Sequence, residues 1–261
     1  MNAAAAAAAF GLTGPCEPLA GGEGTSVRCG DSVLKPAPES HEARFVQETL
    51  ASLDAAGVGA ARLRIPAVRR APDGRTVVDG WTATEFVAGL QELRPDWAAV
   101  VEAGRRFHTL LVPIPGSPAL ADRTHRWAVA DRVAWDEQQV WLTPDAARVD
   151  ATLRGWCRAT PEPSQLVHAD LTGNVLVDPD GTPVIIDFSP YVRPRTFATA
   201  VVVVDALLWN DAPLDVIDLL GPEPRPTLAR ALRFRLVAEQ LATAPRHGAV
   251  VDHYEDLLSR L

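Results

Sequence analysis

The sequence predicts an α+β fold with two lobes, a small antiparallel sheet followed by a larger and mainly helical region. Short apolar segments, separated by Gly-rich, Gly-Asp and Pro-Asp-Gly turns, occupy the chain from about residue 19 to about residue 87. After Pro95 the apolar spacing becomes mainly helical, apart from one hairpin. We therefore expect the first lobe to comprise residues 1–86 and the second lobe residues 87–261.

The composition indicates an ordinary globular protein with a sizeable core. The chain has 261 residues, of which 47% are hydrophobic and 22% charged, and its formal net charge is −8. This charge argues against a general nucleic-acid-binding or acidic-membrane surface and is compatible with a cationic substrate. The apolar run 198–209 is too short to span a bilayer, so it predicts a buried helix. We expect no nucleic-acid or membrane partner, and the oligomeric state stays open.

The cysteines predict neither a disulfide framework nor a zinc site. Cys16, Cys29 and Cys157 are widely spaced and form no Cys-x-x-Cys or Cys/His cluster. This pattern favours a reducing cytoplasm. The seven alanines after Asn2 lack the basic segment of a secretory signal, so we expect a short or frayed helix there.

Individual elements follow from turn signals and apolar periodicity. In the first lobe, residues 41–53 have helical spacing, with Glu42 on the apolar face. In the second lobe, residues 175–178 and 183–187 flank a Pro-Asp-Gly-Thr turn and predict a β-hairpin. A last helical stretch is expected at residues 228–241, after a Pro-rich loop. The strands expected in the first lobe are residues 25–29, 32–35, 65–68 and 76–78, and the segment 81–87 is expected to lead out of this sheet.

Functional side chains cluster around the predicted hairpin. The motif His168-Ala-Asp170-Leu-Thr-Gly-Asn174 precedes it, and Ile-Asp187-Phe follows it. Because a hairpin brings its ends together, we expect Asp170 and Asn174 to lie close to Asp187. Phosphoryl transfer from ATP needs such groups: one carboxylate accepts a hydroxyl proton, and an amide and a second carboxylate hold Mg²⁺.

These motifs resemble the His-Arg-Asp…Asn and Asp-Phe-Gly motifs of protein kinases. They resemble more closely those of the aminoglycoside-phosphotransferase (choline-kinase-like) family, which typically read His-Gly-Asp…Gly-Asn-Val-Leu and Ile-Asp-Phe. The resemblance implies a two-lobed protein-kinase-like fold, with Asp170 as catalytic base and Asn174 and Asp187 as Mg²⁺ ligands. It places His168 in the catalytic set, mainly as the residue that ties the loop to the core. The Asp-Phe-Ser segment and the apolar run after it also resemble a group of actinobacterial kinase-like proteins.

On the nucleotide side, the family has a third-strand lysine that binds the α- and β-phosphates of ATP, and Lys35 occupies that position. Lysine is rare in this chain, although a snorkelling surface lysine would fit the same pattern. Its partner acid would be Glu42 or, alternatively, Glu48 on the following helix.

Two further segments resemble nucleotide-binding parts of the family. The turn Gly21-Gly22-Glu-Gly24 resembles the phosphate-covering loop, although Gly-rich hairpins are common. Glu85 and Val87 lie where the family's inter-lobe linker binds the adenine edge through a backbone carbonyl and amide, although an ordinary edge strand would also fit.

The sequence therefore predicts an ATP- and Mg²⁺-dependent phosphotransferase that acts on a hydroxyl of a small molecule, such as an antibiotic, a sugar or a metabolite. A catalytically silent, kinase-like nucleotide-binding or interaction protein is the alternative. Its support is the loop length, because Asn174 follows Asp170 by four residues and most kinase-like loops have five. A protein kinase is less favoured, because no Ala-Pro-Glu segment follows Asp187.

The sequence does not identify the acceptor. Asp205 and Asp211 could attract a cationic acceptor or could cap helices. The second lobe also has indoles that could line an acceptor pocket or belong to the core: Trp127, Trp135, Trp141, Trp156 and Trp209.

Overall fold

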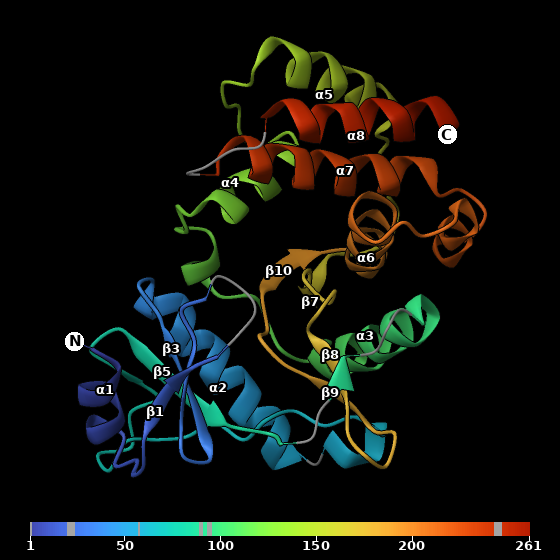
Figure 1. Cartoon of the computed structure of the whole chain (residues 1–261). Helices are drawn as coiled ribbons and strands as arrows, with labels where there is room; N and C mark the ends of the chain where they lie inside the picture. The colour runs from blue at the N-terminus through green and yellow to red at the C-terminus, as the bar shows by residue number, and fades with distance from the viewer. Residues whose placement is uncertain (1, 20–23, 57, 89–90, 93–95, 243–246) are drawn as a thin grey trace. The chain divides into compact units, whose positions relative to one another are not determined.

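A computed structural model gives the fold and describes residues 2–19, 24–56, 58–88, 91–92, 96–242 and 247–261. The chain forms two compact units (Figure 1). One boundary between them falls after Leu93, near the division that the sequence predicts after residue 86. The first unit comprises Met1–Leu93, Ser117–Ala121 and Gly173–Phe188, and the second comprises Arg94–Gly116, Asp122–Thr172 and Ser189–Leu261.

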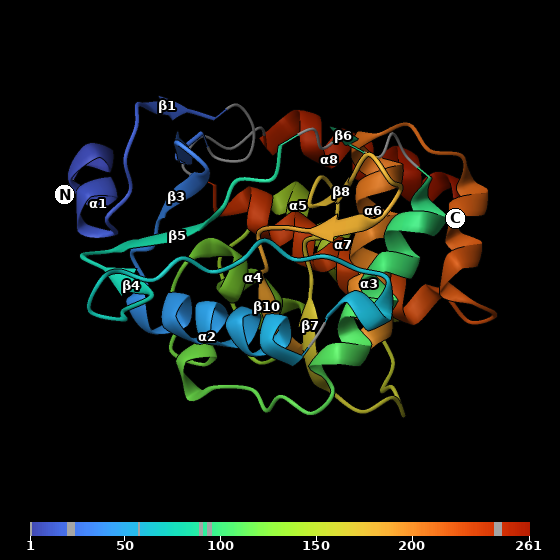
Figure 2. The same ribbon diagram turned by 90° about the horizontal axis from the view of Figure 1, so that it is seen from below.

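The first unit is built on an antiparallel sheet. Helix α2 (Ser40–Ala56) lies beside β4 (Figure 2), and α1 (Ala3–Ala9) packs against β1 and β3. The helix predicted at residues 41–53 and the strand pair predicted at 25–29 and 32–35 are confirmed. The described residues give five strands in the spatial order β1 (Cys16–Pro18), β2 (Val27–Cys29), β3 (Ser32–Pro36), β5 (Trp81–Glu85) and β4 (Val77–Val78).

Residues 65–68 do not form the regular strand that the sequence predicts. Val68 makes an isolated bridge to Thr84, and the Glu85 N–H donates to the Ala67 carbonyl at 2.8 Å. The Ala67 N–H donates to the side-chain carboxylate of Glu85 at 3.2 Å and not to the backbone of β5, which limits the pairing around this bridge.

Cys16 and Cys29 form a disulfide, so the prediction of no disulfide is wrong. The two residues are 13 positions apart in the chain, but β1 and β2 pair with Cys16 opposite Cys29, and their Cα atoms lie 4.2 Å apart. Strand register creates this proximity, and cysteine spacing alone does not reveal it. The argument from cysteine usage for a reducing cytoplasm therefore falls.

The predicted hairpin is present and belongs to the first unit. Strands β8 (Val175–Val177) and β9 (Pro183–Ile185) pair antiparallel, and the Asp178 N–H donates to the Thr182 carbonyl across the turn. The sequence predicts this hairpin in the second lobe. It joins the first unit because β8 also pairs with β6 (Gln91–Glu92).

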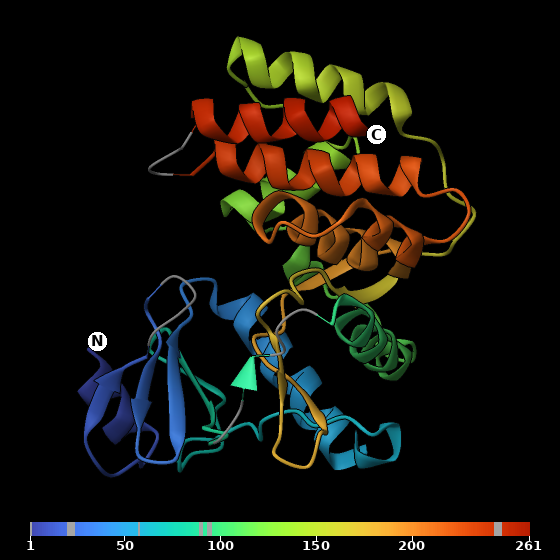
Figure 3. The same ribbon diagram turned by 45° about the vertical axis from the view of Figure 1, so that its right-hand side comes forward.

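The second unit is mainly helical, with a two-stranded sheet of β7 (Gln165–His168) and β10 (Pro190–Arg193). Figures 1 and 3 show α5, α8 and α7 packed side by side. The predicted helices at 198–209 and 228–241 are confirmed as α6 and α7, whereas α8 was not predicted. The helical elements are α3 (Trp97–Leu111), α4 (Arg126–Ala134), α5 (Pro144–Trp156), α6 (Arg195–Trp209), η3 (Leu214–Leu220), α7 (Arg225–Gln240) and α8 (His247–Arg260).

Helix α6 lies in the core of this unit. Eleven of its 15 residues are buried, as expected for a helix that is apolar on every face. The Glu162 carboxylate accepts hydrogen bonds from the N–H groups of Arg195 and Thr196 and so caps the first turn. Among the residues that the structure describes, no helix has the length and apolar character needed to cross a membrane.

Candidate active site

The first unit brings Lys35 and Asp187 together. Lys35 is the only lysine of the chain, and its ammonium donates to Asp187 Oδ1. The neighbouring strand residue Leu34 is fully buried on the opposite face, whereas the side chains of Lys35 and Asp187 are each 45% exposed. Asp187 has a φ of +51°, a left-handed conformation that aspartate tolerates better than most residues. The sole lysine thus meets the carboxylate of the Ile-Asp-Phe motif at a solvent-accessible position.

Asn174 lies at the same end of the hairpin as Asp187. The Ile186 N–H donates to the Asn174 carbonyl at 3.0 Å, next to the paired residues Val175 and Ile185. Asn174 therefore lies opposite the residue that precedes Asp187. One carboxamide and one carboxylate are hard oxygen donors of the type that Mg²⁺ prefers, so the donor set fits this metal.

The other residues predicted on the nucleotide side have varied positions. Gly24 has a φ of +69°, and apart from its chain neighbours no described heavy atom lies within 4 Å of the place that a Cβ would occupy there. Gly21 and Gly22 lie outside the described residues. Glu42 is half-buried in the first turn of α2, and Glu48 is exposed on the same helix. In the structure, the ion-pair partner of Lys35 is Asp187. The pairing of Lys35 with Glu42 stays a prediction.

Glu85 ties the edge of the first sheet to the chain before it. Its carboxylate accepts from Arg64 Nη2 at 2.8 Å and from the Ala67 N–H at 3.2 Å. Arg64 Nη1 also donates to Asp178 in the hairpin turn at 3.1 Å. The side chain of Glu85 is thus structural, which leaves a backbone role for Glu85 and for the half-buried Val87 as a prediction.

In the second unit, His168 anchors the loop that carries Asp170. The imidazole is fully buried, and its Nδ1 accepts from the N–H groups of Asp170 and Ser189, each at 3.3 Å. The His168 N–H in turn donates to His108 Nε2 at 3.0 Å. Burial, followed by the electrostatic influence of the neighbouring His168 side chain, lowers the pKa of His108 to about 3, so His108 is a neutral acceptor.

Asp170 is paired with a buried arginine that the sequence analysis did not single out. Its side chain is 41% exposed, and its Oδ1 accepts from Arg235 Nη2 at 2.8 Å. Arg235, on α7, also donates through Nε and Nη2 to the two oxygens of Asp205 on α6, at 2.7 and 2.6 Å. Asp205 therefore neither caps a helix nor faces solvent. The sequence signal for this pair was a single acid inside the apolar run 198–209, since a buried charge needs a partner.

The electrostatics of this cluster follow from its burial. Burial raises the pKa of the Asp205 carboxyl, and the charge of Arg235 opposes that rise. Burial alone would lower the pKa of Arg235, but the carboxylates of Asp205 and Asp170 outweigh it, and the pKa rises. The guanidinium thus stays charged between its two partners.

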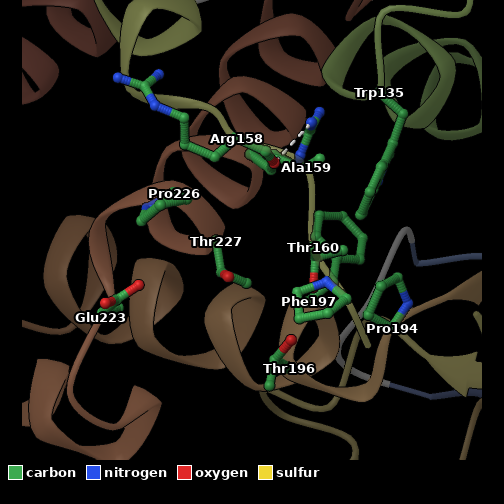
Figure 4. A pocket seen from close by; sticks show the side chains of 12 residues that line it. Trp135, Arg158, Ala159, Thr160, Pro194, Thr196, Phe197, Glu223, Pro226 and Thr227 are labelled. Carbon is green, nitrogen blue, oxygen red and sulfur yellow. Dashed lines mark hydrogen bonds between the residues drawn. The ribbon is translucent and has the colours of Figure 1, made fainter. Parts of the chain in front are cut away.

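A pocket in the second unit lies between α6, α7 and the segment that follows α5 (Figure 4). Trp135 and Phe197 meet edge to face there at 5.6 Å, and the guanidinium of Arg230 lies 4.4 Å from the Trp135 ring. None of the predicted catalytic, nucleotide-binding or metal-binding residues lines this pocket, but Trp135, one of the indoles considered for an acceptor pocket, does. Trp135 also packs against the core of this unit, whereas Trp141 is 79% exposed.

Comparisons with known proteins agree with these observations. A family model described as "Phosphotransferase enzyme family" matches residues 16–192. A search of curated protein sequences finds no significant match.

Solved structures of kinases share the fold of this chain. A microcompartment-associated aminopropanol kinase is 19% identical with a TM-score of 0.64, covering 99% of this chain and 98% of the other. The amicoumacin kinase hAmiN, in complex with AMP-PNP, Ca²⁺ and Ami, is 13% identical with a TM-score of 0.67, covering 98% and 92%. A choline/ethanolamine kinase family protein from Mesorhizobium loti is 20% identical with a TM-score of 0.54, covering 95% and 88%. The predicted α+β, kinase-like fold is therefore confirmed.

Proposed function

Because the chain belongs to the phosphotransferase enzyme family, we propose that it transfers the γ-phosphoryl group of ATP, with Mg²⁺, to a hydroxyl of a small molecule. The observation that carries the proposal is the pairing of Lys35 with Asp187. The only lysine of the chain and the carboxylate of the second motif converge, although 152 positions separate them. A cation for phosphate and an anion for metal are needed side by side at the phosphates of ATP.

The residues have distinct parts in the proposed reaction. Asp170 orients the acceptor hydroxyl and takes its proton as the oxygen attacks the γ-phosphorus, and the bond to the β-phosphate oxygen breaks to release ADP. His168 holds the loop of Asp170. Lys35 binds the α- and β-phosphates. Asn174 and Asp187 would hold Mg²⁺, which neutralises charge on the phosphate oxygens.

The backbone of the first unit would bind the rest of the nucleotide. The Glu85 N–H is already used by the Ala67 carbonyl, so Glu85 would offer its carbonyl and Val87 its amide to the adenine edge. Gly21, Gly22 and Gly24 would cover the phosphates, where residues without a Cβ allow close approach of the backbone. Glu42 would bind Lys35 when Asp187 turns to the metal.

The structural neighbours guide the choice of acceptors for a test. They include the aminopropanol kinase, the choline/ethanolamine kinase family protein and a spectinomycin phosphotransferase crystallised with ADP and spectinomycin. We therefore propose a panel of 1-amino-2-propanol, choline, spectinomycin and simple sugars. Phosphorus NMR would follow the conversion of ATP to ADP and a new phosphate ester, with Mg²⁺ and with EDTA.

The expected result is an ester that forms only with Mg²⁺. The variant Asp145→Asn is a matched control, since it makes the same chemical change at an exposed carboxylate on α5 that pairs with Arg148. Its rate should equal that of the wild type, whereas Asp170→Asn should lower the rate roughly 10²- to 10⁴-fold.

A catalytically silent nucleotide-binding protein is the second candidate, and the four-residue spacing of Asp170 and Asn174 favours it. The same experiment separates the two. Binding of Mg·ATP without transfer to any acceptor would support the silent protein, and absence of Mg·ATP binding would contradict both.

A further inference from the structure

Arg235 is a buried cation that holds the carboxylate of Asp170. Its side chain is only 7% exposed, whereas that of Asp170 is 41% exposed and comes from a loop. The contact joins Arg235 Nη2 to Asp170 Oδ1 at 2.8 Å. A loop carboxylate that is open to solvent on one side is thus fixed on the other by a group inside the core.

The guanidinium itself has little freedom to move. Its Nε and Nη2 bind the two oxygens of Asp205 in a bidentate pair, and Nη2 carries a second hydrogen for Asp170. The rings of Trp127 and Phe234 each lie 5.2 Å from the guanidinium carbon. Because the planar fork is held by Asp205 and the two rings, the direction of the bond to Asp170 is also set.

Neither a helix cap nor simple packing accounts for this arrangement. A buried ion pair of Arg235 and Asp205 alone would already be neutral, with each charge balanced by the other. The third member adds a charge-assisted hydrogen bond to the one carboxylate for which a base role is proposed. Catalysis by positioning depends on such orientation, because a displacement of about 1 Å can cost on the order of 10²-fold in rate.

We infer that Arg235 is a positioning residue for the transfer: it holds Oδ1 of Asp170 so that the carboxylate meets the acceptor hydroxyl in one orientation, and Asp205 holds Arg235. This inference rests on the proposed function. It concerns orientation of the base, so it predicts a loss in turnover and no loss in nucleotide binding.

The test compares Arg235→Met and Arg235→Lys with the wild type, using Mg·ATP and the acceptor from the panel that the wild type phosphorylates fastest. We expect kcat to fall on the order of 10²-fold in Arg235→Met, while the Kd of Mg·ATP from calorimetry changes less than about threefold. Arg235→Lys should keep more activity than Arg235→Met but less than the wild type, because an ammonium cannot reproduce the bidentate fork. Circular dichroism would establish whether each variant is folded. If Arg235→Met is not folded, Arg235→Lys alone decides the test, and its kcat is expected to fall at least about tenfold.

The chain offers a matched control on the same helix. Arg233 is equally buried, at 3% exposure, and is ion-paired to Asp150 at 2.8 Å and to Asp136 at 3.0 Å. It is two positions before Arg235, and its carboxylate partners are not Asp170. Arg233→Met should lower stability but leave kcat within about threefold of the wild type.

Three results would count against the inference. A folded Arg235→Met or Arg235→Lys protein with the kcat of the wild type overturns it, and so does an equal loss of kcat in Arg233→Met. If the wild type itself transfers no phosphoryl group to any acceptor, the proposed function fails and the inference falls with it. Transfer by the wild type together with undiminished kcat in the variants overturns the positioning role alone.

Discussion

Lys35 on β3 forms an ion pair with Asp187 at the end of the β8–β9 hairpin. Since both side chains are 45% exposed, the pair contributes no more than about 1 kcal/mol to folding. Two opposite charges that are accessible and add little stability can readily exchange partners. Phosphate oxygens would replace Asp187 at Lys35, and Mg²⁺ would replace Lys35 at Asp187.

Labelling of Lys35 by an acyl-phosphate derivative of ATP tests its position at the phosphates. Because the chain has a single lysine, we expect one labelled lysine-containing peptide by mass spectrometry, and excess Mg·ATP should protect it. Lys35→Arg keeps the charge but removes the reactive amine, so it serves as the control. Labelling that excess Mg·ATP does not reduce would contradict the assignment.

Removal of Arg235 should strongly destabilise the protein. In Arg235→Met, Asp205 is left as a buried charge without its cation, which costs about 3–5 kcal/mol. The double variant Arg235→Met/Asp205→Leu removes both charges and should recover most of this loss. Urea unfolding gives the free energy of each. An unfolding free energy of Arg235→Met within about 1 kcal/mol of the wild-type value would show that the Arg235–Asp205 pair contributes little to stability.

His108 should make the fold sensitive to acid. Its folded-state pKa of about 3 lies below the ordinary value of about 6.5, so its contribution to stability is fully present above pH 6.5 or so and is lost as the pH falls toward 3. In that range the unfolded chain binds the extra proton, and stability falls by up to about 1.4 kcal/mol per pH unit. His108→Gln retains a neutral acceptor for the His168 N–H. Its free energy of unfolding, measured with urea at several pH values, should fall less steeply with decreasing pH than that of the wild type. An equal pH dependence of the unfolding free energy in the wild type and His108→Gln would contradict this contribution of His108 to acid sensitivity.

Gly104 on α3 is packed against the residue that follows Asp170. A Cβ at this position would lie 2.4 Å from Leu171 Cδ1, and Leu171 is buried. We expect Gly104→Ala to lose about 1–3 kcal/mol of stability through overpacking and to lower kcat, because Leu171 adjoins Asp170. Gly155→Ala on α5 is the control: apart from its own helical turn, no described heavy atom lies within 4 Å of the added Cβ, so the helix should gain up to about 1 kcal/mol. Thermal unfolding and steady-state kinetics would measure both, and a Gly104→Ala protein as stable and active as Gly155→Ala would refute the packing argument.

Local patterns predicted the elements that are governed by short-range chemistry. The hairpin of β8 and β9 has a turn signal between two apolar arms, and α6 is a continuous apolar run, so both were predicted with nearly correct bounds. The segment 65–68 carries the same apolar signal as a strand, but the Ala67 N–H donates to the side chain of Glu85, so no regular ladder forms there.

Long-range relationships were mostly beyond the sequence. The Cys16–Cys29 disulfide depends on the register of β1 and β2, and the Asp170–Arg235–Asp205 cluster depends on how α6 and α7 pack. Neither register nor helix packing follows from one sequence. The motif residues were predicted because their spacing resembles a family, whereas Arg235 belongs to no motif and became visible only through its contacts.

The most direct test of the account measures transfer from bound Mg·ATP to the acceptor in a single turnover, with wild type and Asp170→Asn compared after equal loading of nucleotide. We predict that Asp170→Asn binds Mg·ATP with the affinity of the wild type and transfers the phosphoryl group at least about 10²-fold more slowly. Transfer by Asp170→Asn at the rate of the wild type would contradict the account, because Asp170 would then not be the base.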